Sequence, residues 1–110
     1  MLDQTPIRKY LEAKSIPLVA YCPLAQGRAA SNQALVAIGR KHDASAAQVA
    51  LKWLLDQKDV AAIPKASRKE SQQSNLDALK VMLDDADRAA IAALPKDQRF
   101  VKPAFHPEWD

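Results

Sequence analysis

The sequence predicts a helix-rich α/β fold, and three observations support this prediction. Two short apolar runs, LVAYC and VAAI, both end at a proline and lie far enough apart for a helical crossover between parallel strands. The segments around these runs place apolar residues at helical spacing. The 110 residues include 21 Ala but only two Gly, which disfavours an all-β fold built on tight hairpins.

The expected elements alternate between helix and strand. In order, they are a helix over 6–14, a strand over 18–22, a loop over 23–30, helices over 32–41 and 46–57, a strand over 60–64, and helices over 68–79 and 85–94. The apolar runs predict strands that are buried on both faces. Because two strands do not make a stable sheet alone, the sheet needs more strands from a longer chain or from copies of this one.

Capping residues predict where the first helices begin. Thr5 is an N-cap residue type and precedes Pro6, which suits the first helical position. After the first strand, Ser31 is the expected cap of the next helix. Ser45 is the expected cap of the helix over 46–57.

The later elements follow from the same signals. Val49, Trp53 and Leu54 form an apolar stripe on the helix over 46–57, which predicts that they belong to the core. The second strand leads directly into Ser67-Arg68-Lys69-Glu70, which fits a capping box. An aspartate cap followed by further acidic residues predicts the start of the last helix.

Composition excludes several classes of protein. A single cysteine excludes an internal disulfide, and with only two histidines a compact Cys/His zinc site is also excluded, so we expect no metal. No apolar run approaches the roughly 20 residues that span a bilayer, and the first residues do not resemble a signal peptide. We therefore expect a cytoplasmic protein with no membrane partner. The net charge of +3 is small, so the placement of the cations matters more than their number.

Three cations lie where the second strand meets the following helix. Lys65, Arg68 and Lys69 surround a predicted helix N-terminus, where free backbone N–H groups and the helix dipole favour anions rather than cations. A bound phosphate would explain this placement, with Lys65 and Arg68 donating charge-assisted hydrogen bonds. A solvated basic turn is the alternative interpretation.

The loop after the first strand is a second candidate. Tyr21 offers a ring for stacking, and Gln26 and the backbone offer polar contacts. Alternatively, Tyr21 is a core aromatic residue and Cys22 a small buried apolar one. Catalytic groups are scarce: His42 beside Asp43 suits a helix C-terminus better than a catalytic base.

Three segments together resemble the aldo-keto reductase family. IPLVAYCPLAQG is similar to the family pattern A-Y-S-P-L-x-x-G, and SAAQVALKWLLDQKDVAAIPKAS is similar to S-x-A-Q-V-A-L-x-W followed by I-P-K-S. NLDALKVMLDDADRAAIAAL resembles the family's closing segment, and the tail RFVKPAFHPEWD is closest to the 2,5-diketo-D-gluconate reductase branch. The resemblance covers nearly the whole chain.

The resemblance implies the C-terminal part of a (β/α)8 TIM barrel, with strands 7 and 8, their helices and the closing tail. Residues 1–98 would form the partial barrel, and residues 99–110 would be a tail bordering the substrate pocket, with Phe105 and Trp109. The implied cofactor is NADPH and the implied substrate a small aldehyde, ketone or dicarbonyl such as methylglyoxal. The implied cofactor contacts are Tyr21, Cys22, Leu24, Gln26, Lys65, Ala66, Ser67, Arg68, Ser71 and Asn75.

Three positions depart from the family pattern. Cys22 and Ala66 each replace a usual Ser, and Ser71 stands where many relatives have an Arg packing on the adenine. The family's catalytic Asp, Tyr, Lys and His lie on earlier strands and match no position here. The resemblance therefore implies cofactor binding without catalysis by these 110 residues alone.

Other functions stay open at the level of sequence. One alternative is a non-catalytic module that binds a nucleotide or another anion. A helix-turn-helix is disfavoured because the helix over 46–57 lacks a row of Arg, Asn or Gln suited to base edges, so we expect no nucleic-acid partner. Copies of the chain could also associate through the exposed edge of the partial barrel.

Overall fold

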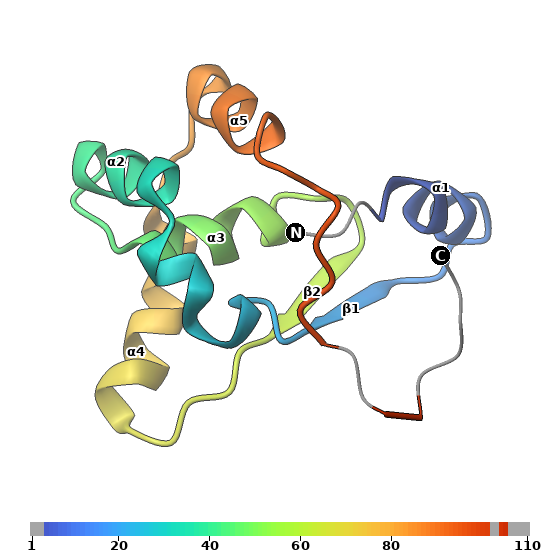
Figure 1. The fold of residues 1–110 in the computed structure, drawn as a ribbon, viewed down its shortest axis with the longest axis horizontal. Coiled ribbons are helices and arrows are strands. Elements are labelled where there is room, and N and C mark those ends of the chain that lie inside the picture. The colour runs from blue at the N-terminus through green and yellow to red at the C-terminus, as the bar shows by residue number, and fades with distance from the viewer. Residues whose placement is uncertain (1–3, 102–103, 106–110) are drawn as a thin grey trace.

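A computed structural model of the chain describes residues 4–101 and 104–105. Several helices and a small two-stranded sheet make up the fold, as Figure 1 shows. In chain order, the elements are α1 (Thr5–Ala13), β1 (Leu18–Tyr21), the 3₁₀ helix η1 (Ala25–Ser31), α2 (Gln33–Lys41), α3 (Ala46–Leu55), β2 (Val60–Ile63), α4 (Lys69–Asp77), the 3₁₀ helix η2 (Ala78–Lys80) and α5 (Asp85–Ala92). This order confirms the predicted alternation of helix and strand.

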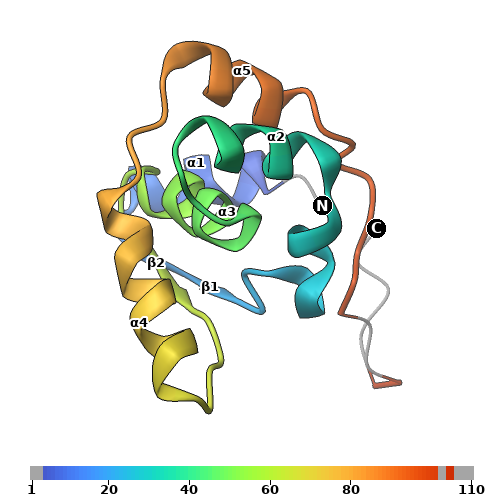
Figure 2. The ribbon, with the colours of Figure 1, turned by 90° about the vertical axis from the view of Figure 1, so that its left-hand side faces the viewer.

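β1 and β2 pair in parallel, with Leu18 opposite Val60 and Tyr21 opposite Ile63. The prediction that both strands are buried on both faces was wrong, because exposure alternates along each strand. Tyr21 and Ile63 are 61% and 59% exposed. In Figure 2, α2, α3 and α5 all lie on one side of the sheet, which leaves its other face uncovered.

The core lies among the helices on the covered side of the sheet. Val49 of α3 is fully buried, which confirms the prediction that it belongs to the core. Trp53 is only half-buried and packs against the buried core residues. Leu54 is half-buried as well. The buried cluster comprises Leu35, Ile38, Ala46, Val49, Ala50, Val81, Leu83 and Ile91.

Two of the predicted helix starts have the predicted chemistry. Ser45 caps α3, and its hydroxyl accepts a hydrogen bond from the backbone N–H of Gln48 while the Gln48 side chain accepts one from the Ser45 N–H. Asp84 and Asp87 form the same capping box at α5. Each box satisfies backbone N–H groups that the helix itself cannot pair.

Two other helix starts differ from the prediction by one residue. The N-cap of α2 is Asn32 rather than Ser31, because its side-chain oxygen accepts a hydrogen bond from the Leu35 N–H while the Ser31 hydroxyl donates one to the Arg28 carbonyl instead. Thr5 lies inside α1, whose N-cap is Gln4.

α2 and α3 approach one another closely at the turn between them. Gly39 is buried in α2, and a Cβ at this position would lie 2.4 Å from the Ala44 carbonyl oxygen. Only glycine therefore permits this contact without a backbone shift. Within the described part of the chain, no helix is long and apolar enough to cross a membrane.

Candidate functional site

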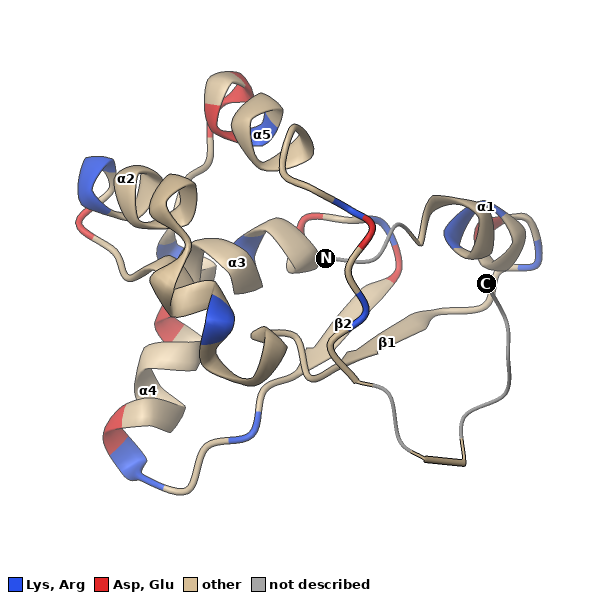
Figure 3. Cartoon of the chain, viewed as in Figure 1, with Lys and Arg blue, Asp and Glu red and all other residues tan. Residues whose placement is uncertain are grey.

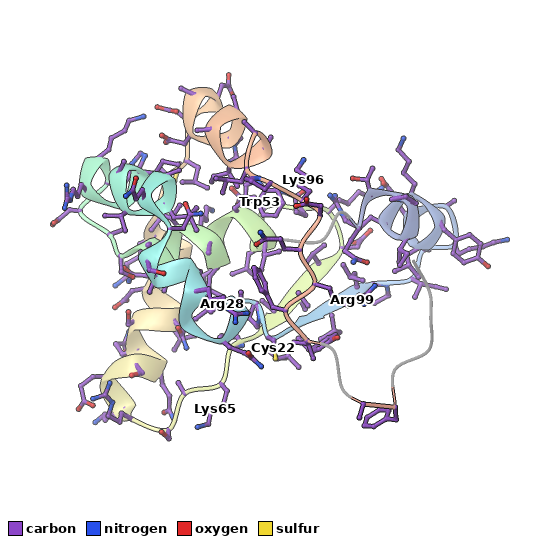
Figure 4. The ribbon with its side chains drawn as sticks, in the orientation of Figure 1. Cys22, Arg28, Trp53, Lys65, Lys96 and Arg99 are labelled. Carbon is purple, nitrogen blue, oxygen red and sulfur yellow. The ribbon has the colours of Figure 1, made fainter. Side chains whose placement is uncertain are left out.

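The register of the sheet brings the two predicted site loops together. Tyr21 and Ile63 are partners across the two strands, so the segments that follow β1 and β2 begin side by side at the carboxyl edge of the sheet. Ligands of α/β proteins bind at this edge. Figure 4 places Cys22 and Arg28 on the first of these segments and Lys65 on the second.

The segment after β1 is more ordered than the predicted loop over 23–30, because most of it forms η1. Its backbone turns sharply through left-handed conformations, with φ of 47° at Cys22, 50° at Ala25, 56° at Gln26 and 91° at Gly27. A Cβ at Gly27 would meet nothing within 4 Å, so glycine is required there by the backbone angle and not by space.

The predicted contacts on this segment point in different directions. Tyr21, Cys22 and Gln26 are exposed and can reach a ligand. Leu24 is half-buried and packs against the core, and its carbonyl accepts hydrogen bonds from the backbone N–H groups of Gly27 and Ala29. The alternative in which Tyr21 and Cys22 are core residues is therefore wrong, and Leu24 mainly anchors the segment.

α4 begins without the predicted capping box. Arg68, not Ser67, is its N-cap residue, and within the described part of the chain no side-chain cap hydrogen bond forms at this helix start. The helix starts one residue later than predicted, so Ser67 precedes the N-cap position and Glu70 is the second residue of the helix. A capping box needs these two residue types at the N-cap and at the third helical position. The N–H groups of the first turn therefore lack a side-chain acceptor, in contrast to those of α3 and α5.

The cations around this helix start are exposed, and their charge is not neutralised by neighbouring side chains. Among residues 4–101 and 104–105, Lys65, Arg68 and Lys69 have no carboxylate partner. Figure 3 shows this basic segment leading into α4. Exposed cations and free N–H groups at the positive end of a helix dipole form a suitable binding site for an anion.

The other predicted contacts extend this site along α4. Ser71 and Asn75 are both half-buried, and their spacing of four residues places them on the same side of the helix. The Ala66 carbonyl accepts a hydrogen bond from Gln72 Nε2 at 3.2 Å, which ties the segment after β2 to the helix. The structure thus brings the predicted contacts of both loops to one edge of the sheet.

The predicted substrate-side tail lies only partly within the described residues. Phe105 is 88% exposed, and Trp109 lies outside the described residues. Phe100 is half-buried, and its ring centroid lies 4.7 Å from the Arg28 guanidinium carbon. Sequence analysis missed this contact because 72 positions separate the two residues and no local pattern links them.

His42 has a structural environment rather than a catalytic one. It is the C-cap residue of α2, and its Nε2 lies 2.6 Å from Asp87 Oδ2. Burial would raise the pKa of Asp87, but hydrogen bonds from His42, the Asp84 backbone N–H and Lys41 together hold that pKa well below its usual range. This cluster joins α2 to α5 and includes none of the predicted site residues.

The described part of the chain contains no metal-binding group of three or more His, Cys, Asp or Glu side chains. Its two tyrosines, Tyr10 and Tyr21, are exposed, and the structure gives neither of them a hydrogen bond to a Lys, His or Asp side chain. A tyrosine that donates a proton at neutral pH needs such neighbours to lower its pKa.

The chain is similar to bacterial carbonyl reductases. It is 34% identical to the methylglyoxal reductase DkgB of Escherichia coli O157:H7 over 110 residues, which are 99% of this chain and 41% of that protein. It is 39% identical to the glyoxal reductase of Bacillus subtilis (strain 168) over 98 residues, which are 89% of this chain and 35% of that protein. The chain therefore spans less than half the length of these relatives.

Solved structures share its fold. A crystal structure assigned as a 2,5-diketo-D-gluconic acid reductase B superposes with a TM-score of 0.91 at 32% identity, over 99% of this chain and 40% of that one. A silkworm (Bombyx mori) aldo-keto reductase complexed with NADPH gives a TM-score of 0.81 at 32% identity, over 93% of this chain and 34% of that one. The model of the Aldo/keto reductase family matches residues 1–96. The chain belongs to the aldo/keto reductase family.

Proposed function

We propose that this chain supplies the cofactor-binding side of an NADPH-dependent reductase of small carbonyl compounds. In this proposal, β1 and β2 are strands 7 and 8 of a (β/α)8 barrel, formed by residues 1–98, and residues 99–110 border the substrate pocket. The uncovered face of the sheet supports this arrangement, because a barrel would bury it in its interior. The relatives' names indicate dicarbonyl substrates such as methylglyoxal and glyoxal.

The start of α4 is the observation that supports cofactor binding most strongly. Lys65 and Arg68 are exposed, lack carboxylate partners in the described structure, and adjoin a helix terminus without a side-chain cap. These features fit a phosphate monoester, and we assign Lys65 and Arg68 to the 2′-phosphate, with Ala66 and Ser67 beside it. The arrangement would select NADPH over NADH, which lacks that phosphate.

The remaining contacts extend from the phosphate toward both ends of the dinucleotide. The exposed ring of Tyr21 would stack on the nicotinamide, and the backbone around Cys22 and Gln26 would line the pyrophosphate. Leu24 would hold that segment in place from the core side. Ser71 and Asn75 would lie along the adenine. When bound, NADPH supplies the hydride for carbonyl reduction, and these residues orient it.

The binding test uses the whole 110-residue chain and isothermal titration with 2′,5′-ADP. We expect 2′,5′-ADP to bind more tightly than 5′-AMP. Lys65→Met should lose about 1.5 to 3 kcal/mol of 2′,5′-ADP binding, which is typical of a hydrogen bond to a charged group. The matched control is Lys9→Met, because Lys9 is also exposed but lies on α1. Equal affinities for the two nucleotides, or an unchanged affinity in Lys65→Met, would refute the assignment.

A second assay separates the reductase from a module that only binds nucleotides. Tyr10 and Tyr21 are exposed and have no Lys, His or Asp partner among the described residues, which favours the absence of a proton donor. We therefore expect no NADPH oxidation when the chain alone is mixed with methylglyoxal. The nucleotide-binding module is the better description if a full-length barrel that includes this chain also binds NADPH without reducing any dicarbonyl.

A further inference from the structure

The segment after α5 crosses the molecule toward the carboxyl edge of the sheet. This segment, residues 95–101, is called the strap below. Figure 4 labels Lys96 at its start and Arg99 further along. In both Figure 1 and Figure 2 the strap runs down from α5 and passes beside η1. It therefore brings residues 95–101 to the segment that we assign to the cofactor.

One specific contact joins the strap to η1. The guanidinium carbon of Arg28 lies 4.7 Å from the ring centroid of Phe100, well within the range of a cation–π interaction. Arg28 is exposed, and among the described residues no carboxylate pairs with it. Phe100 is half-buried, so its ring is held in place while the guanidinium stays accessible to solvent.

Arg28 follows a segment in which several residues have left-handed backbone conformations. It follows directly after Gln26 and Gly27, whose φ angles are 56° and 91°. Non-glycine residues in the left-handed region persist only where their surroundings hold them. Inside the segment, the Leu24 carbonyl supplies two of the hydrogen bonds that do so. The Arg28–Phe100 contact adds a restraint from outside the segment.

We propose that Arg28 and Phe100 form a clamp that couples the segment after β1 to the strap. Fixing either side then favours the ordered conformation of the other, because an energetic coupling between two sites acts in both directions. Given the proposed function, on which this step rests, NADPH binding at the segment after β1 orders the strap next to the substrate pocket. Arg28 is thus a positioning residue and not a catalytic one.

The first test needs no cofactor. Hydrogen–deuterium exchange is measured on the 110-residue chain and on three variants: Arg28→Met, Phe100→Leu and the control Arg40→Met, which removes an exposed arginine from α2. We expect Phe100→Leu to raise exchange in residues 24–30 about threefold, and Arg28→Met to raise exchange in the strap by a similar factor, the scale of one cation–π contact. Arg40→Met should change neither. An effect confined to the mutated side in both variants would refute the clamp.

The second test adds NADPH. In the wild-type chain we expect NADPH to slow exchange in the strap, and in Phe100→Leu this distant protection should disappear while protection of residues 24–30 remains. Arg28→Lys should retain part of it, because a lysine also interacts with an aromatic ring. If NADPH protects the strap equally in Phe100→Leu, the clamp is wrong although the proposed function stands. If the wild-type chain does not bind NADPH, the proposed function fails. The exchange measurements without cofactor still test whether Arg28 and Phe100 couple the two segments.

Discussion

At the scale of single residues, Asp87 shows how one buried carboxylate joins two helices. It is only 4% exposed, and it accepts hydrogen bonds from Lys41 Nζ at 3.0 Å and from the Asp84 backbone N–H at 3.1 Å, in addition to its contact with His42. These partners favour the charged form of the carboxylate. Asp87 therefore fixes the first turn of α5 against the last turn of α2.

This arrangement predicts a pH dependence of stability. Since the pKa of Asp87 is lower in the folded chain than in the unfolded chain, its contribution is complete above the ordinary aspartate pKa of about 3.9 and is lost as the pH falls further. We expect the free energy of unfolding, measured by urea titration between about pH 5 and pH 2, to fall less steeply in Asp87→Asn than in the wild type. Asp85→Asn is the control, because Asp85 is exposed in the same turn. A wild-type slope in Asp87→Asn would contradict this role.

The position of a site residue could be predicted from the sequence where it depends on the neighbouring residues in the chain. Lys65 and Arg68 could be placed at a strand end because the strand and the helix around them each have local signals. The direction of Leu24 and the pairing of Arg28 with Phe100 could not, because both depend on how distant segments pack.

At the scale of elements, the helix starts divide into two kinds. α3 and α5 begin with capping boxes, whereas α4 begins at Arg68 without a side-chain cap. A cation is an unfavourable N-cap residue for the helix dipole, so α4 gives up stability at this position. Such a local cost is expected where a site needs free N–H groups.

Arg68→Asp separates the two roles of this position. Aspartate caps a helix well, so we expect the variant to be about 1 kcal/mol more stable than the wild type in urea unfolding. It should also bind 2′,5′-ADP more weakly, because the new carboxylate both occupies the N–H groups and repels the phosphate. Arg40→Met again serves as the control for loss of an exposed arginine. A variant that is more stable and binds equally well would contradict the site at α4.

The elements themselves were more predictable than their ends and their burial. The order of helices and strands, and the caps at Ser45 and Asp84, follow from local signals. The start of α2 differs from the prediction because Ser31 and Asn32 are adjacent residues of cap-forming types, and Asn32 makes the capping hydrogen bond. The start of α4 differs because the helix begins after Arg68, a residue whose side chain cannot cap it. The strands are more exposed than predicted. An apolar sequence shows that burial of a strand is favourable, but it does not show whether the described residues cover both faces of that strand.

At the scale of the whole molecule, the sheet is open on its edges and on one face. Val19, Tyr21 and Ile63 are 54%, 61% and 59% exposed on the uncovered face. Exposed strand edges and apolar patches promote association with other chains. In the proposed function this surface faces the rest of a barrel, and we expect that further copies of the chain also bind to it.

Val19→Lys tests this surface. We expect the wild-type 110-residue chain to associate as its concentration rises, and Val19→Lys to shift that association to severalfold higher concentration, because a charge on the uncovered face opposes its burial. Ala37→Lys adds the same charge to an exposed position of α2 and should leave the association unchanged. Sedimentation velocity over a concentration series measures both. Equal behaviour of the two variants would exclude the sheet as the associating surface.

The close approach of α2 and α3 also has a consequence for the order of folding. The Ala44 N–H reaches back to the Gly39 carbonyl at 2.8 Å, so this helical hairpin forms from neighbours in the sequence. Pairing β1 with β2 must instead close the intervening residues 22–59, which costs more chain entropy. We therefore expect the hairpin to form first and to serve as the surface on which the two strands later meet.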